Sequence, residues 1–473
     1  MSDAQMSQQT EQTGDSIPNF LMLEQIPTNY VQQIETDLLE PVVFSQGGQT
    51  TDGFARFTLQ NKGFLHSHSK IFVALDPAAN IAKGFLQPQV GIGQIIKKAV
   101  LKIGNKALNE LDSWSGLHAV KSSLITNENN YEREMFTTGR WMAHEFDFNA
   151  DSRTFADDYS LDTGNEKVGD DRKLPSWYIM GQTADECPSF QIDLSDLFPF
   201  LKVNQLPLYM IREPITIELT FQPTLGLRLQ TGSGDMGSLC DIVRSELKFC
   251  ADYIYYGATD EMARFEAANQ DMSFSFVDYR LVENTTTAAA LGTTVIRNLG
   301  MANRIVPRII TVLPDTGEGV STILGGSNSI APFTNASGVQ GATAAAIKYN
   351  VRYNDRFEYT SDVDSLSRLF SNFTQSEGVP FITRSEFSNQ SVNAITDGTI
   401  EGRAQRTAAG GLEGHMFYLG TRLTNGRVGQ RGIEIHVTGD FSASGSQPDL
   451  MRTYCEYVRV ARLSGGFMEI FNA

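Results

Sequence analysis

The sequence predicts an all-β protein built as two strand-rich sandwiches in tandem. The segment 214–221 alternates apolar and polar residues, and a similar alternation returns near the end of the chain, at 432–441. Such alternation is typical of a half-buried β-strand. The 41 glycines often separate short apolar runs, which favours strands joined by turns over long helices. With 473 residues, the chain is long enough for two such units.

In the first half, short strands are expected from about residue 37 onward. They are expected at 41–46, 55–60, 69–77, 98–111 (a hairpin that turns at Gly104-Asn105-Lys106), 176–182 and 214–221. Between them, helical spacing of Leu117, Val120 and Leu124 predicts one or two helices within 116–136. The acidic run 145–171 has no apolar period and indicates a long excursion between strands.

The second half repeats this organisation after a small, flexible stretch, GSGDMGS, at 232–238, which is typical of a boundary. Strands are expected at 246–257, 271–284, 304–314, 432–441 and 454–463, with a helix near Ser365. A short helix that begins at Asp260 places Met262 and Phe265 on one side.

The predicted division has four parts. They are an N-terminal arm (1–36), a first unit (37–231, with a long loop at about 140–175), a linker (232–240) and a second unit (241–473, with a long loop at about 315–346).

Composition restricts the function. Acidic residues outnumber basic ones by 55 to 38, for a formal net charge of −17, and such a field opposes nucleic-acid binding over the whole surface. The start of the chain shows no signal-peptide pattern and no long apolar stretch occurs, so neither a secretory leader nor a membrane-spanning helix is expected. The few, widely spaced cysteines predict buried free thiols; they are Cys187, Cys240, Cys250 and Cys455.

His66 and His68 are the best candidates for metal ligands. On a strand, residues two apart share a face, so both imidazoles could reach one ion. Cupin metal sites use such a pair together with a glutamate and a third histidine, whereas here Lys70 follows and would repel a cation. The alternative is a polar strand edge or a contact between subunits.

No other constellation predicts chemistry. The sequence contains no phosphate-binding loop, no nucleophile elbow and no zinc-protease motif. No catalytic residue and no cofactor are therefore predicted, and the chain is not expected to be an enzyme.

Four segments carry a family resemblance. They are GFLHSHSKIFVALDP (63–77), IIKKAVLKIGNKALNELDSWSGLHAVKSSLI (95–125), NNYEREMFTTGR (129–140) and FQIDLSDLFPFLKVNQLPLYMIREPITIELTF (190–221). They resemble the major capsid proteins of polinton-like viruses and virophages, in the lineage that includes adenovirus hexon and the large DNA viruses. The last segment is the most specific.

The resemblance implies two tandem eight-stranded jelly rolls with a few short helices and long inter-strand loops. It implies a homotrimer with a pseudo-hexameric outline that tiles the icosahedral shell of a double-stranded DNA virus. Neighbouring capsomers, penton and minor capsid proteins are the implied partners, and the arm would lie beneath the capsomer, against minor proteins or an inner membrane. The implied location is the capsid shell of the virion, assembled inside the host cell, and no sequence-specific nucleic-acid binding is expected.

Assembly contacts are expected from the long loops and from the small apolar island of the arm. The candidate residues are Phe20, Leu21, Leu23, Phe146, Phe148, Phe155 and Phe333. These aromatic and apolar side chains suit the surfaces that symmetric assembly requires.

One alternative stays open, because tandem jelly rolls also occur in proteins that bind or cleave carbohydrate. That function needs an aromatic-lined groove and a pair of carboxylates. The three tryptophans, Trp114, Trp141 and Trp177, all lie in the first half, and the sequence does not indicate that they converge.

Overall fold

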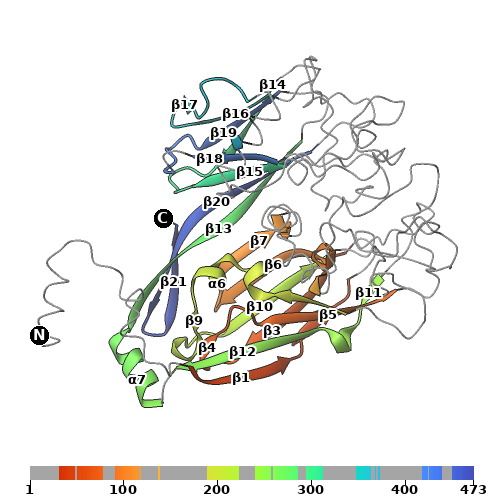
Figure 1. The fold of residues 1–473 in the computed structure, drawn as a ribbon, viewed down its shortest axis with the longest axis vertical. Helices are drawn as coiled ribbons and strands as arrows, with labels where there is room; N and C mark the ends of the chain where they lie inside the picture. The colour runs from red at the N-terminus through yellow and green to blue at the C-terminus, as the bar shows by residue number, and fades with distance from the viewer. Residues whose placement is uncertain are drawn as a thin grey trace, which may run out of the picture.

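Four antiparallel β-sheets and three short α-helices make up the part of the chain that the computed structural model describes. This part comprises residues 31–47, 51–77, 91–114, 117–118, 137–138, 189–222, 240–256, 259–285, 294–312, 348–363, 368, 371–372, 418–423, 426–438 and 450–472. Figure 1 shows the sheets stacked along the longest axis of the molecule. The lower two sheets form a first sandwich and the upper two form a second.

The first sandwich has eight main strands. They are β1 (Val31–Leu39), β3 (Gly53–Leu59), β5 (Lys70–Pro77), β6 (Ile96–Ile103), β7 (Lys106–Asp112), β8 (Ser189–Asp193), β10 (Ile215–Phe221) and β12 (Lys248–Tyr256). Shorter strands lie beside them: β2 (Val43–Ser45), β4 (Phe64–Leu65), β9 (Leu206–Pro207) and β11 (Cys240–Ile242). One sheet has the order β1-β12-β5-β8, and the other has the order β3-β10-β6-β7. With the main strands numbered 1 to 8 along the chain, the orders are 1-8-3-6 and 2-7-4-5.

The second sandwich repeats these orders. Its main strands are β13 (Asp271–Thr285), β14 (Thr294–Gly300), β15 (Arg308–Val312), β16 (Lys348–Tyr353), β17 (Arg356–Phe357), β18 (Tyr418–Arg422), β19 (Ile433–Thr438) and β20 (Leu450–Ser464). The sheets run β13-β20-β15-β18 and β14-β19-β16-β17, with β21 (Phe467–Asn472) added beside β20. These orders are again 1-8-3-6 and 2-7-4-5.

Alternating apolar side chains from the two facing sheets form each core. In the first sandwich, β10 buries Ile217 and Leu219 completely, and Phe57 of one sheet lies against Phe249 of the other with ring centroids 6.0 Å apart. In the second, Val351 and Ile435 are fully buried. Each core therefore lies between a 1-8-3-6 sheet and a 2-7-4-5 sheet.

The α-helices of the described part are α5 (Leu194–Leu197), α6 (Pro199–Val203) and α7 (Thr259–Ala268), and its 3-10 helices are η3 (Gly91–Ile95), η7 (Leu208–Met210) and η8 (Arg244–Glu246). Helix α7 is the helix predicted at Asp260. None of the helices in these ranges is long and apolar enough to cross a membrane.

Most of the predicted strands that fall in the described part are confirmed, including the hairpin that forms β6 and β7. Other predictions lie outside the described residues. They are the strand at 176–182, most of the helical regions at 116–136 and near Ser365, and the loops at 140–175 and 315–346.

The strand pairing differs from the predicted boundaries. Strand β12, which the sequence places in the second unit, pairs with β1, β4 and β5 of the first sandwich. It is strand 8 of that sandwich, so the pairing changes at α7 and not at 232–240. Strand β1 begins at Val31, inside the predicted arm 1–36. Alternation identifies a strand and its buried face, but it does not identify the strand's partners.

Gly432 offers a test of the second sandwich. Its φ is +76°, and a Cβ there would lie 2.3 Å from the backbone oxygen of Gly300. We expect Gly432→Ala to lower the free energy of unfolding by about 3 kcal/mol, because left-handed strain and a backbone clash add. Gly465 has φ +58° and open space around it, so Gly465→Ala should cost only about 1 kcal/mol. Denaturant unfolding measures both, and equal costs would contradict the assigned backbone contact.

Candidate functional site at the junction of the two sandwiches

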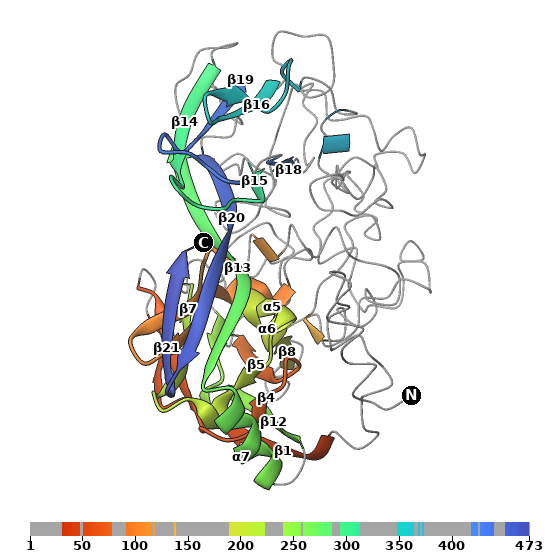
Figure 2. The same ribbon diagram turned by 90° about the vertical axis from the view of Figure 1, so that its left-hand side faces the viewer.

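The two sandwiches meet where the long strands β13 and β20 extend beyond the second sandwich. The strands pair from Asp271 opposite Ser464 to Thr285 opposite Leu450. Figures 1 and 2 show that their lower ends, with β21, lie against β7 and α6 of the first sandwich. The same two strands therefore belong to both the second core and the junction.

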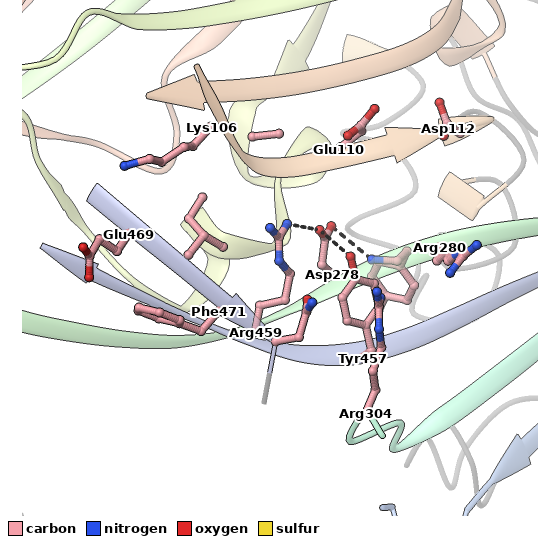
Figure 3. A pocket seen from close by; sticks show the side chains of 14 residues that line it. Lys106, Glu110, Asp112, Asp278, Arg280, Arg304, Tyr457, Arg459, Glu469 and Phe471 are labelled. Atoms are coloured by element: carbon pink, nitrogen blue, oxygen red, sulfur yellow. Dashed lines mark hydrogen bonds and ion pairs between the residues drawn. The ribbon is translucent and has the colours of Figure 1, made fainter. Parts of the chain in front are cut away.

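A buried carboxylate lies at the centre of this junction (Figure 3). Asp278 of β13 is 1% exposed, and it accepts hydrogen bonds from Arg459 Nη1 at 2.7 Å and from Asn109 Nδ2 of β7 at 3.1 Å. Arg459 Nη1 also donates to the Leu108 carbonyl at 3.0 Å, and the Tyr457 hydroxyl donates to Asp278 at 3.3 Å. Burial raises the pKa of Asp278, and the guanidinium of Arg459 offsets part of this rise. The network links one strand of the first sandwich to two strands of the second.

Asn109 also joins α6 to the junction. Its Oδ1 accepts from the Phe200 backbone N–H at 3.0 Å while its Nδ2 donates to Asp278, so both halves of the amide are used. Phe200 lies edge-on to Phe274 and Phe276 of β13, with centroids 5.7 and 5.1 Å away. The charged network is therefore covered by an aromatic cluster on its α6 side.

Backbone groups hold the turn between β20 and β21 on the first sandwich. The Met468 carbonyl accepts from Lys106 Nζ at 2.5 Å, and the Met468 N–H donates to Glu213 Oε2 at 3.0 Å. The Arg212 N–H donates to the Gly466 carbonyl at 2.9 Å. These contacts and the buried network join the two sandwiches through both backbone and side-chain groups.

A groove of about 820 Å³ runs along the junction (Figure 3). Basic residues such as Lys106 and Arg304 line it together with acidic residues such as Glu110 and Glu469. The mixed lining selects no sign of ligand charge. No group of three or more metal-ligating side chains occurs within the described ranges.

His66 and His68 lie in the turn between β4 and β5, and not on a strand as the metal hypothesis assumed. The Ser69 N–H donates to the His66 carbonyl at 3.1 Å, which closes the turn. The His68 N–H donates to His66 Nδ1 at 3.0 Å, and the His68 ring lies 3.7 Å from an Asp193 carboxylate oxygen. A local hydrogen bond therefore occupies one ring nitrogen of His66.

Acid should weaken this turn. Burial lowers the pKa of His66 from its usual 6.5, and His68 adds to this shift. A lowered pKa favours the neutral imidazole in the folded state, so its contribution to stability is present above 6.5 and is lost as the pH falls below that value. We expect His66→Asn, whose amide oxygen can still accept the bond, to reduce the fall in Tm between about pH 7 and pH 5. An unchanged Tm profile would contradict this role.

All of the predicted assembly residues lie outside the described part of the chain. They are Phe20, Leu21, Leu23, Phe146, Phe148, Phe155 and Phe333. Trp141 and Trp177 also lie outside it, whereas Trp114 is 2% exposed and donates its indole N–H to the Asp196 carbonyl at 3.0 Å. Trp114 therefore lines no carbohydrate groove.

Two free thiols are described, at Cys250 and Cys455. Cys455 is fully buried, and burial raises its pKa to about 12, so it stays a protonated thiol. The prediction of a buried free thiol is confirmed at Cys455, whereas Cys250 is half-buried.

The junction residues Asp278, Arg459 and Asn109 are not among the residues predicted from the sequence. One signal was present, since Asp278 follows Phe274 and Phe276 at intervals of two and so occupies the apolar face of a strand. A carboxylate in such a position needs a buried partner. The sequence does not identify that partner.

No family model and no curated protein matches the chain. Solved structures do match it. A chain of the Sputnik virophage structure, solved by cryo-EM, is 11% identical with a TM-score of 0.56, over 94% of this chain and 90% of that chain. VP54 of PBCV-1, a crystal structure fitted into a cryo-EM reconstruction of Sputnik, is 12% identical with a TM-score of 0.52. The match covers 95% of this chain and 99% of the VP54 chain. A chain of the PBCV-1 virus capsid is 11% identical with a TM-score of 0.52, and the match covers 95% of this chain and 99% of that chain.

The chain has a double jelly-roll fold. The duplicated sheet orders, 1-8-3-6 and 2-7-4-5, and the similarity over almost the whole length decide this. The predicted fold class, two tandem jelly rolls with a few short helices, is confirmed. The first and second sandwiches are the first and second jelly rolls.

Proposed function

We propose that this chain is the major capsid protein of an icosahedral double-stranded DNA virus, and that three copies form a pseudo-hexameric capsomer. The observation that carries the proposal is that one strand topology occurs twice in a single chain. The two jelly rolls contact each other through a buried junction. Three chains of two rolls each make a ring of six similar units. Such a ring fills a six-neighbour position in a shell with three polypeptides.

The fixed junction supports a structural role. A capsomer needs the angle between its two rolls to be the same in every copy, and the network around Asp278 sets that angle. The chain has the fold of structures from the PBCV-1 capsid and the Sputnik virophage. Its role is therefore to build a shell rather than to catalyse a reaction.

The proposal extends to boundaries, partners and location. The first jelly roll spans 31–256 and the second spans 271–472, with α7 between them. The protein lies in the shell of the virion after assembly inside the host cell. Its partners are neighbouring capsomers, penton and minor capsid proteins, with the arm beneath the capsomer against minor proteins or an inner membrane. The candidate apolar residues of the arm and loops supply some of these contacts.

Size-exclusion chromatography with light scattering tests the proposal. The purified protein should elute at three times the chain mass of 52.2 kDa. A particle that stays at one chain mass, both alone and when produced together with the other virion proteins, would overturn it.

A further inference from the structure

Strand β21 is an edge strand at the junction of the two rolls. It pairs with β20 on one side, from Phe467 opposite Ser464 to Asn472 opposite Arg459, and with no strand of the described part on its other side. Figure 2 shows β21 at the margin of the sheet, beside β20. An edge strand presents main-chain N–H and C=O groups on its free side, and these groups can pair with another chain.

The pairing register decides which main-chain groups of β21 face away from β20. The two strands are joined by the two-residue turn 465–466, so Phe467, the first residue after the turn, forms a hydrogen-bonded pair with β20. Successive residues of a strand in such a ladder direct their main-chain groups to opposite sides. Met468, Ile470 and Asn472 therefore direct their N–H and C=O groups away from β20.

The first of these three residues already has partners. The Met468 N–H donates to Glu213 and its carbonyl accepts from Lys106, which confirms the direction of its main-chain groups. Within the part of the chain that the structure describes, the outward main-chain groups of Ile470 and Asn472 make no hydrogen bond. These two residues, here the β21 edge, offer two donors and two acceptors in strand register.

The β21 edge borders the junction groove of about 820 Å³ (Figure 3). Residues 469–472 of β21 line one side of this groove, and Lys106 and Glu110 of β7 line another. A groove of this volume lies within the size range of ligand clefts in proteins. Its lining carries charges of both signs, which suits a ligand that is held by main-chain hydrogen bonds more than by its charge.

We infer that the β21 edge binds an extended segment of a second virion protein, which adds to the sheet as a further strand beside β21. This inference rests on the proposed function, because the partner belongs to the same shell. In strand addition, main-chain hydrogen bonds supply affinity and alternate side chains supply specificity. Phe467 and Phe471 share one face of β21 and are 54% and 50% exposed. The segment therefore carries an apolar side chain on that face.

The position of the β21 edge favours a single extended segment over a second copy of this chain. Glu213 and Lys106 of the first roll bind Met468, so the free side of β21 lies against the first roll of its own chain. A second β21 carries its own first roll on the same side. Two such edges cannot approach to the strand spacing of about 4.8 Å, whereas a segment without a folded domain beside it can enter the groove.

Hydrogen–deuterium exchange measured by mass spectrometry tests the inference. The free trimer is compared with shells assembled from this chain together with the other virion proteins. In the segment 467–472, the shells should take up about two fewer deuterons at short times, because the amides of Ile470 and Asn472 become protected. Protection of these amides already in the free trimer would mean that copies of this chain fill the edge, and would overturn the inference.

A matched pair of variants at Ile470 isolates the main-chain contact. Ile470→Pro removes the outward N–H but should keep the pairing with β20, because this N–H does not face β20. Ile470→Ala loses the side-chain packing but keeps the N–H. Shells of Ile470→Pro should lose both the partner protein and the protection, and shells of Ile470→Ala should keep both. If Ile470→Pro does not fold, Asn472→Pro and Asn472→Ala give the same comparison at an exposed residue.

The outcomes separate this inference from the proposed function. Shells that form, but whose segment 467–472 exchanges as fast as in the free trimer, would overturn strand addition and leave the proposed function in place. Equal protein content in shells of the proline and alanine variants would also overturn it. A wild-type chain that forms no shell with the other virion proteins would instead overturn the proposed function.

Discussion

Replacing Asp278 with alanine is expected to lower the free energy of unfolding by about 3–5 kcal/mol, because it leaves the largely buried guanidinium of Arg459 without its carboxylate. Arg459 is 16% exposed and Asp278 1% exposed, so water replaces little of the lost interaction. Asn109 would also lose the acceptor for its amide N–H. Denaturant unfolding of the purified chain measures the loss.

Two comparisons isolate the cause. Asp278→Ala combined with Arg459→Met should recover much of the stability, because removing both charges leaves no uncompensated ion. Lys97→Ala breaks the pair that Lys97 forms with Asp52, in which the two side chains are 48% and 36% exposed, and should cost no more than about 1 kcal/mol. If Asp278→Ala costs no more than Lys97→Ala, the junction does not depend on the buried pair.

Phe249→Ala is expected to cost about 3–5 kcal/mol, because it opens a cavity in the first core. Phe249 is fully buried on β12 and lies against Phe57 of β3. Phe471→Ala on β21, whose side chain is 50% exposed, should change stability by only about 0.5 kcal/mol.

Phe249 lies on β12 and its partner Phe57 lies on β3 of the facing sheet. Their contact therefore tests whether β12 belongs to the first roll. Phe57→Ala and Phe249→Ala should be non-additive by about 0.5–1.5 kcal/mol, because the two rings share one core. Fully additive costs would mean that β12 does not close the first roll.

The sequence predicts strands well and their partners poorly. Alternation located both β10 and β19, and the structure shows that each is strand 7 of its own roll. The similar endings of the two halves are therefore equivalent strands. Alternation also located β12, yet its partner strand β1 is distant in the sequence: Thr36 of β1 pairs with Asp252 of β12, 216 residues later. Local patterns do not encode such pairing.

Strand β1 was not predicted from the sequence because its apolar residues point outward and its acidic residues point inward. Its inward positions include Glu35 and Asp37, which Lys62 neutralises at 2.5 and 2.7 Å, while Ile34 and Leu38 point outward. Lys62 also lies 4.6 Å from the centre of the Tyr253 ring. Without this lysine in view, acidic residues at alternate positions suggest a flexible arm.

The candidate site could not be predicted from spacing. Asp278 lies 169 residues from Asn109 and 181 from Arg459, so only the fold brings them together. His66 and His68 are close in sequence, but they lie in a turn and not on a strand. Their side chains therefore do not share the face that two alternate residues of a strand would share. The family resemblance supplied the double jelly roll, and the strand orders confirm it independently.

The most direct test of the central claim is cryo-EM of the purified assembly, averaged without imposed symmetry. The account predicts a threefold particle with a hexagonal outline and six similar densities, two for each chain. A particle without a threefold axis, or one in which the two jelly rolls of a chain take variable orientations, would contradict it.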